Sequence, residues 1–150
     1  MYDDILVPTD GSDEVATALT QAFELASTYD ATVHALYVVD DNRGSSGLMG
    51  INDSDPLEPL QRRGQTAVED IAKNARDVGV SVTTAVRRQT PHEGIRIYAD
   101  ERDVDLIVMS SRGNSGISRA LFGSVTERVL RTTERPVLVV SRTNAIEASE

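Results

Sequence analysis

Short apolar runs alternate with longer amphipathic segments over most of the chain. Five runs have the length and composition of strands, at residues 2–8, 32–39, 80–86, 106–109 and 135–140. Between them, apolar residues recur three and four positions apart, which predicts four helices. The strand cores are continuously apolar, except that residues 80–86 alternate. Continuous apolar cores are typical of strands that are buried on both faces.

This alternation predicts a single α/β domain. We expect a doubly wound, Rossmann-like sheet of five parallel strands in the order 3-2-1-4-5, with helices on both faces. In such sheets the ligand site lies at the carboxyl ends of the strands, where the strand order reverses. The first and fourth strands flank that point, and they end in Pro8-Thr9-Asp10 and Met109-Ser110-Ser111. These two segments should therefore face each other.

Capping residues mark the expected ends of the helices. Ser12 is expected to cap the first helix and Thr90 the third. Gly79 predicts the end of the second helix. Ser124 and Glu127 have the spacing of a capping box, in which each side chain bonds a backbone N–H, at the start of the fourth helix.

Composition narrows the class of protein. The chain has 150 residues, no Cys, no Trp and a formal net charge of -9. Without Cys, disulfides, thiol catalysis and Cys-bound metals are excluded. The acidic balance argues against a general nucleic-acid or membrane-surface binder, because both ligands are polyanions. No apolar run approaches the length of a membrane span, and no signal segment precedes the first strand, so we expect a cytoplasmic protein.

The basic residues are unusual, because Lys73 is the single lysine among the 15 Lys and Arg residues. Acid-rich, lysine-poor surfaces suit solubility in concentrated salt, which suggests a halophilic source such as a halophilic archaeon. An acidic protein from a GC-rich genome has the same composition, so both sources stay open.

Residues 104–130 combine a strand, a loop rich in Gly, Ser and Arg, and a helix start. Gly113 and Gly123 bracket nine residues, and Ser124 follows directly. In this order, backbone N–H groups and the positive end of a helix dipole surround a place where an anion can bind. Arg112 and Arg119 can add charge-assisted contacts.

This stretch resembles the ATP-binding branch of the universal stress protein family. The family motif is Gly, two residues, Gly, nine residues, Gly and Ser or Thr, and here Ser110, Gly113, Gly123 and Ser124 fall at its fixed positions. Further blocks match in order: ILVPTDGS, LYVVD, DLIVMS and GSVTERVLR. The resemblance runs over residues 3–141. It implies an ATP-binding regulatory or stress-response protein, with Mg²⁺ or Mn²⁺ bridging the phosphates.

The resemblance also implies nucleotide-binding roles for individual residues. The end of the first strand would contact adenosine, with Asp10 beside the ribose or base, and Val38 would pack on adenine and bond it through its backbone. The end of the fourth strand would lie beside the ribose, and the loop with the Ser124 hydroxyl would hold the triphosphate. The implied residues are Pro8, Thr9, Asp10, Val38, Met109, Ser110, Gly113, Gly123, Ser124 and Val125, to which Arg112 is added for its charge.

One position departs from the family motif, because Ser110 stands where the first glycine is expected. A Cβ at this point is expected to reduce or alter nucleotide affinity without abolishing it.

Three other interpretations stay open. Slow ATP hydrolysis is the first, but no lysine follows the glycine loop as in Walker motifs and no base is aimed at a water, so no catalytic residue is assigned. A nucleotide-free interaction module of the same fold is the second, with Ser110 as its hint. A phosphoacceptor receiver domain is the third, disfavoured because Asp3 and Asp4 begin the first strand rather than end it.

The remaining segments carry weaker expectations. Residues 40–56 form a polar loop that is either a lid or plain disorder. His34 falls within a strand and has a structural role in our interpretation. The domain is expected to span residues 1–143, followed by a polar tail at 144–150. The last strand, Val137 to Ser141, is a bare sheet edge that needs a partner, and the resemblance implies a homodimer formed through it.

Overall fold

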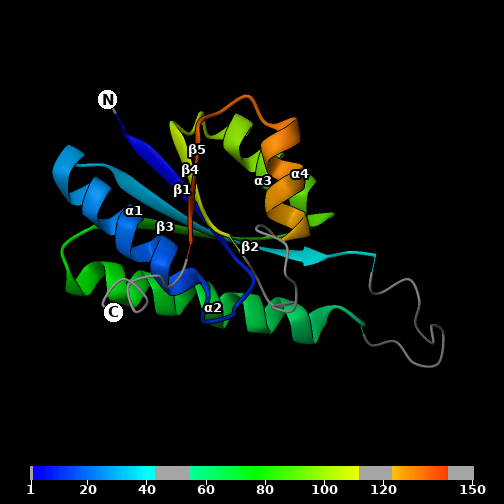
Figure 1. Cartoon of the computed structure of the whole chain (residues 1–150). Coiled ribbons are helices and arrows are strands. Elements are labelled where there is room, and N and C mark those ends of the chain that lie inside the picture. Colours follow the sequence, from blue (N-terminus) through cyan, green and yellow to red (C-terminus); the bar gives the residue numbers. More distant parts are fainter. Residues whose placement is uncertain (1, 43–54, 112–122, 142–150) are drawn as a thin grey trace, which may run out of the picture.

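The strands and helices of the chain alternate strictly along the sequence (Figure 1). The computed structural model describes residues 2–42, 55–111 and 123–141. Within these residues the elements are β1 (Asp4–Thr9), α1 (Val15–Tyr29), β2 (Thr32–Asp40), α2 (Glu58–Asp77), β3 (Ser81–Gln89), α3 (Pro91–Glu101), β4 (Leu106–Ser110), α4 (Ser124–Thr132) and β5 (Val137–Val140).

All five strands pair in parallel in the order β3-β2-β1-β4-β5. The predicted α/β class and strand order are confirmed. The strand bounds differ slightly from the expected ones, mainly because β3 extends to Gln89, where it still pairs with Asp40 of β2. Strands β1 and β4 are neighbours, so the sheet reverses its strand order between them.

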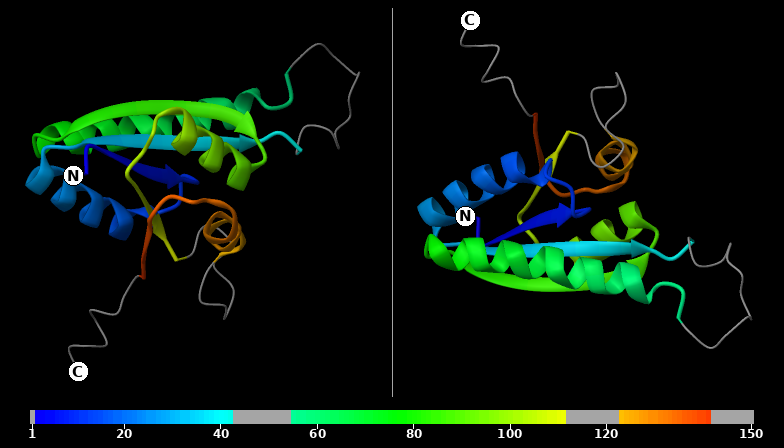
Figure 2. Two further views of the ribbon diagram at one scale, coloured as in Figure 1. Left: turned by 90° about the horizontal axis from the view of Figure 1, so that it is seen from above. Right: turned by 90° about the horizontal axis from the view of Figure 1, so that it is seen from below.

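Helices α1 and α2 cover one face of the sheet, and α3 and α4 cover the other (Figures 1 and 2). Successive residues of β1 alternate between these layers: Ile5 and Val7 pack under α1 and α2, while Leu6 packs under α3 and α4. All three side chains are fully buried. Burial on both faces explains why the central strands read as continuous apolar runs. The edge strands β3 and β5 are less buried.

None of the three predicted caps makes the expected side-chain hydrogen bond. Helix α1 begins at Val15, and the Ser12 hydroxyl is buried without a hydrogen-bond partner among the described residues. Thr90 is the N-cap of α3 but makes no side-chain capping bond. Gly123, rather than Ser124, is the N-cap of α4, and Glu127 pairs instead with Arg131 one turn later, at 2.9 Å.

The predicted end of α2 at Gly79 is confirmed. Gly79 has a φ of 77°, a conformation that glycine adopts without strain. Its N–H donates to the Arg76 carbonyl at 3.1 Å, and the Val80 N–H donates to the Ala75 carbonyl at 2.8 Å. This pair of bonds is the Schellman motif, which satisfies the last carbonyls of the helix and turns the chain into β3.

A polar cluster near the amino end of the sheet joins β1, β2 and α3. His34 Nε2 donates to Asp4 Oδ1 at 2.9 Å, because a carboxylate can only accept. The Tyr98 hydroxyl then donates to His34 Nδ1 at 2.8 Å. His34 is 4% exposed and Tyr98 is fully buried. Both ring nitrogens are satisfied, which confirms the structural role predicted for His34.

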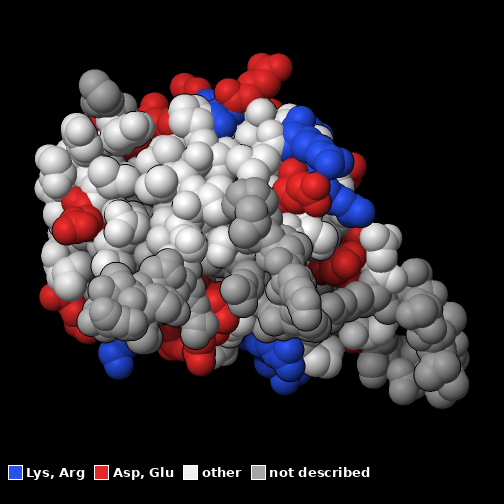
Figure 3. All heavy atoms as spheres, in the orientation of Figure 1, with Lys and Arg blue, Asp and Glu red and all other residues white. Residues whose placement is uncertain are grey.

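Charged side chains of both signs share the face drawn in Figure 3. Acidic and basic residues lie together over α4, where Arg131 pairs with Glu127. On this face the net charge of -9 is therefore not spread as a uniform negative surface. In the part of the chain that the structure describes, no helix is both long and apolar enough to cross a bilayer.

Candidate functional site

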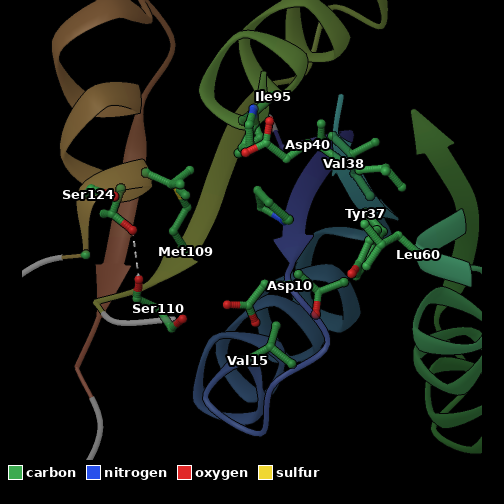
Figure 4. Close-up of a pocket in the computed structure, with 18 of the residues that line it drawn as sticks. Asp10, Val15, Tyr37, Val38, Asp40, Leu60, Ile95, Met109, Ser110 and Ser124 are labelled. Atoms are coloured by element: carbon green, nitrogen blue, oxygen red, sulfur yellow. Dashed lines mark hydrogen bonds between the residues drawn. The ribbon is translucent and has the colours of Figure 1, made fainter. Parts of the chain in front are cut away.

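A pocket of about 330 Å³ lies at the carboxyl ends of β1, β2 and β4, where the strand order reverses. Figure 4 shows side chains from both helical layers lining it. Nine of the predicted site residues line this pocket: Pro8, Thr9, Asp10, Val38, Met109, Ser110, Gly123, Ser124 and Val125. The other two, Arg112 and Gly113, lie outside the described residues, as does Arg119.

The turn after β1 is held by the side chains that end this strand. The Gly11 N–H donates to Thr9 Oγ1 at 3.0 Å, and the Ser12 N–H donates to Asp10 Oδ1 at 2.9 Å. Gly11 has a φ of 85°, which a residue with a Cβ adopts only with strain. These local bonds fix the turn, delay the start of α1 until Val15 and keep Asp10 at the pocket.

Strand β2 extends beyond β1. Its pairing with β1 ends at Tyr37, opposite Thr9, whereas its pairing with β3 continues through residues 38–40. The edge of residues 38–40 that faces β1 therefore has no strand partner among the described residues. Backbone donors and acceptors on such an edge are available to a planar heterocycle, in the way that a strand edge is available to another strand.

The amino end of α4 forms the opposite side of the pocket. Its first backbone hydrogen bond runs from the Glu127 N–H to the Gly123 carbonyl at 3.0 Å. The N–H groups of Ser124, Val125 and Thr126 precede this bond and have no partner within the helix. They lie at the positive end of the helix dipole, and all three residues line the pocket. This end suits an anion.

Hydrogen bonds between β4, β5 and α4 hold this helix end beside the sheet. Thr126 Oγ1 donates to the Ser110 carbonyl at 3.1 Å, a bond drawn in Figure 4. The Gly123 N–H donates to the Ser111 carbonyl at 2.6 Å, and the Ser111 N–H donates to the Val140 carbonyl at 3.0 Å. The end of β4 and the start of α4 are thus connected directly through the described residues.

Two apolar walls face each other across the pocket (Figure 4). Consecutive residues of β2 point to opposite faces of the sheet, so Tyr37 joins the α1–α2 side and Val38 joins the α3–α4 side. The first wall, lined by Val15, Tyr37 and Leu60, comes from α1, β2 and α2, and the second, lined by Val38, Ile95 and Met109, comes from β2, α3 and β4. Between such walls a flat ligand can lie with both of its faces in contact with side chains.

Sequence reasoning missed the whole of the first wall, and Ile95 in the second. Tyr37, Val15 and Leu60 belong to ordinary apolar patterns, so nothing in their periodicity separates the pocket lining from the core. Thr126 was also missed, because it stood inside the presumed capping box. The sequence did contain one usable signal, because the helices behind the walls each carry an isolated glycine, Gly64 in α2 and Gly94 in α3. Such a glycine within a helical pattern usually marks a close packing contact.

The charged side chains that line the pocket within the described residues are Asp10, Asp40 and Arg63. The same part of the chain contains no cluster of three or more His, Cys, Asp or Glu side chains that could hold a metal ion.

A doubly wound parallel sheet with a pocket where the strand order reverses places the chain in the Rossmann-like α/β class, and sequence comparison identifies its family. The profile of the universal stress protein family matches residues 1–141. The chain therefore belongs to the universal stress protein family.

Individual relatives agree with this assignment. Universal stress protein MJ0531 of Methanocaldococcus jannaschii is 37% identical over 149 residues, covering 95% of this chain and 84% of the relative. Universal stress protein MJ0577 of the same organism is 32% identical, covering 97% and 98% of the two chains. The solved structure of MJ0577 matches with a TM-score of 0.86, covering 96% of this chain and 99% of its own. A solved universal stress protein in complex with cAMP is 26% identical, with a TM-score of 0.66 and coverage of 95% and 98%.

Proposed function

We propose that this protein binds an adenine nucleotide, ATP in the first place, and acts in the cytoplasm as a nucleotide-dependent regulatory protein of the stress response. The observation that carries the proposal is the pocket itself. At one end it has two apolar walls and a strand edge that no described strand pairs with, and at the other end it has the start of α4. A heterocycle joined to an anionic chain matches both ends at once.

In the proposed complex, adenine lies between the walls and bonds the backbone of Val38. The ribose lies near Asp10, Met109 and Ser110, which end β1 and β4. The phosphates meet the N–H groups that open α4 and the hydroxyl of Ser124. Gly123 is the N-cap of α4, so Ser124 is the first residue of the helix and its hydroxyl does not occupy the capping position. Mg²⁺ or Mn²⁺ would be held largely by phosphate oxygens.

The comparisons support the adenine nucleotide. A family member with 26% identity was solved in complex with cAMP, which has the same base and ribose as ATP but one cyclic phosphate. The match covers 95% of this chain.

Calorimetry and ligand release test the proposal. Purified protein is denatured, and the released small molecules are identified by absorbance and mass, while ATP binding is titrated in high salt with Mg²⁺. We expect either bound adenine nucleotide or a measurable ATP affinity, and loss of that affinity in Gly123→Val, whose side chain obstructs the phosphate end. Absence of both signals in the wild-type protein would refute the proposal.

Two variants refine the phosphate and ribose regions. Ser110→Gly restores the family glycine, and we expect it to raise ATP affinity because it removes a Cβ from the pocket lining.

Slow hydrolysis, the alternative activity, is measured as phosphate release. Release that persists unchanged in Gly123→Val comes from a contaminant, whereas release that disappears with ATP binding belongs to the pocket.

We also propose a homodimer through β5. This strand ends the sheet, and its Leu138 is 36% exposed. Leu130 of α4, on the neighbouring element, is 39% exposed. A second copy of β5 would extend the sheet and cover apolar surface. Light scattering after size exclusion should report a dimer for the wild type and a monomer for Leu138→Glu; a monomeric wild type contradicts the dimer.

A further inference from the structure

Each wall of the pocket is backed by a glycine inside a helix. Gly64 lies in α2 behind Tyr37, and Gly94 lies in α3 behind Val38. Both glycines are buried. Glycine within a helix costs about 1 kcal/mol relative to alanine, so helical propensity alone does not explain either residue. Neither glycine is among the site residues implied by the family motif.

Gly64 leaves room for the ring of Tyr37. A Cβ at this position would lie 2.5 Å from Cδ1 and 2.9 Å from Cγ of Tyr37. These atoms belong to the root of the ring, which cannot move aside like the tip of a flexible side chain. On its other side, the ring faces Gly11, whose Cβ would lie 3.6 Å from Cε2. A side chain at Gly64 would therefore push the ring toward the Asp10–Gly11 turn.

Gly94 has the same relation to Val38 on the opposite face of the sheet. A Cβ there would lie 2.8 Å from Cγ1 and 3.0 Å from Cγ2 of Val38, and 3.3 Å from Oε1 of Gln89. Valine has little freedom at χ1, so rotation of its side chain relieves one contact only by tightening the other. A side chain at Gly94 would displace Val38, and the displaced residue lines the pocket.

We propose that Gly64 and Gly94 set the separation of the two walls and so act as positioning residues for a flat base. Because Tyr37 and Val38 are consecutive on β2 and are backed from opposite faces, the two glycines control the two walls independently. This inference rests on the proposed binding of an adenine nucleotide. It adds that selection for the planar base resides in α2 and α3, outside the glycine loop.

The test combines ATP calorimetry with double-mutant cycles. We expect Gly64→Ala and Gly94→Ala each to weaken ATP binding about tenfold or more, corresponding to about 1.4 kcal/mol. Gln65→Ala, an exposed position in the same helix, serves as the matched control and should bind like the wild type. Unchanged ATP affinity in both folded glycine variants would overturn the proposal.

The cycles show whether each glycine acts through its wall residue. In a Tyr37→Ala background, Gly64→Ala should have no further effect on ATP affinity. In a Val38→Ala background, Gly94→Ala should likewise have no further effect on ATP affinity. Additive effects would overturn the proposal. If Gly64→Ala alone fails to fold, folding should return in the Tyr37→Ala background, and failure there also contradicts the proposal.

The same variants separate this inference from the proposed function. Denaturant unfolding without ligand measures the coupling between Gly64 and Tyr37 whether or not ATP binds. A wild type that binds no adenine nucleotide would refute the proposed function, and with it the base as the occupant of the walls. A wild type that binds ATP while the glycine variants bind equally well would refute the inference alone.

Discussion

The two ends of the sheet use polar residues in opposite ways. At the amino end, His34 bonds both Asp4 and Tyr98, and the Asp105 carboxylate accepts the N–H groups of Asp3 and Asp4 at 2.8 and 2.9 Å. At the carboxyl end, the β1-facing edge of residues 38–40 and the first N–H groups of α4 border a pocket.

The difference separates stability from binding. A buried polar group that is satisfied within the protein contributes to one well-defined fold, and its loss leaves its partner unsatisfied. Backbone groups that border a pocket contribute little to the fold but remain available to a ligand. Variants at the amino end should therefore change the free energy of unfolding, and variants at the carboxyl end should change affinity.

Tyr98→Ala should have the largest effect. It removes a fully buried aromatic ring and the partner of His34 Nδ1, so we expect the free energy of unfolding to fall by about 3–5 kcal/mol. Denaturant unfolding measures this loss. The matched control Tyr29→Ala removes a tyrosine that is 42% exposed and should cost about 1 kcal/mol. ATP affinity of the folded variant should stay close to that of the wild type; a large loss would show that the two ends are coupled.

Ser124→Pro is the complementary change at the carboxyl end. Proline is well accepted at the first position of a helix, and Gly123 before it has φ -72° and ψ 165°, which suits a residue that precedes proline. The variant loses one pocket-facing N–H and one hydroxyl. We expect ATP affinity to fall about 10- to 100-fold by calorimetry, with the free energy of unfolding almost unchanged. Ser124→Ala separates the hydroxyl from the N–H, and normal affinity in the proline variant would argue against phosphate binding here.

Tyr98→Phe gives a smaller, pH-dependent effect. Without the hydroxyl, Nδ1 of His34 has no donor, which should cost about 1–3 kcal/mol at neutral pH. Burial raises the pKa of Tyr98 above its ordinary value of 10.0, although Arg102 and Arg87 oppose the shift. The unfolded chain therefore releases this proton first, and the stability of the wild type falls as the pH rises above 10.

Unfolding measured from pH 8 to 11 checks this sign. The wild type should lose up to about 1.4 kcal/mol per pH unit from this group once the pH exceeds 10, whereas Tyr98→Phe lacks that contribution. The two curves should approach each other at high pH. Parallel curves would show that Tyr98 does not titrate differently in the folded chain.

Asp55→Asn should have the smallest effect. Arg88 donates to Asp55 Oδ2 at 2.7 Å, and the Leu57 N–H donates to Oδ1 at 3.0 Å; these bonds lower the pKa of Asp55 below its ordinary value of 3.8. A lowered pKa means stability that is present above pH 3.8 and lost as the pH falls through the folded value. Wild type and variant should differ slightly at pH 7 and converge near pH 2, and a difference that persists in acid would contradict this account.

The fold could be predicted because its signals are strong and local. Continuous apolar runs identified β1, β2 and β4 as strands buried on both faces, and handedness rules restricted the topology. The helix caps failed for a physical reason. Ser12 has the right residue type, but Thr9 and Asp10 accept the N–H groups of the turn and delay the helix. A capping pattern does not show which competing hydrogen bond forms.

The site residues could be predicted where they lie at the end or the start of a strand or helix. They could not be predicted where side chains from separate layers of the fold meet. Pro8 to Asp10 and Gly123 to Val125 end or begin elements next to the point where the strand order reverses, so topology alone brings them together. The walls formed by Tyr37 and Ile95 depend on how α2 and α3 pack against β2, which no periodicity shows. Arg112 and Gly113 remain predictions.

The contact between Tyr37 and Gly64 also limits the order in which these positions can change during descent. A side chain acquired first at position 64 meets the tyrosine ring, whereas a smaller residue acquired first at position 37 makes room for it. Relatives that carry a Cβ at the position of Gly64 are therefore expected to carry a smaller residue at the position of Tyr37. The same constraint links Gly94 and Val38. Among relatives, the two residues of each pair should therefore change together, whereas the Tyr37–Gly64 pair should change independently of the Val38–Gly94 pair.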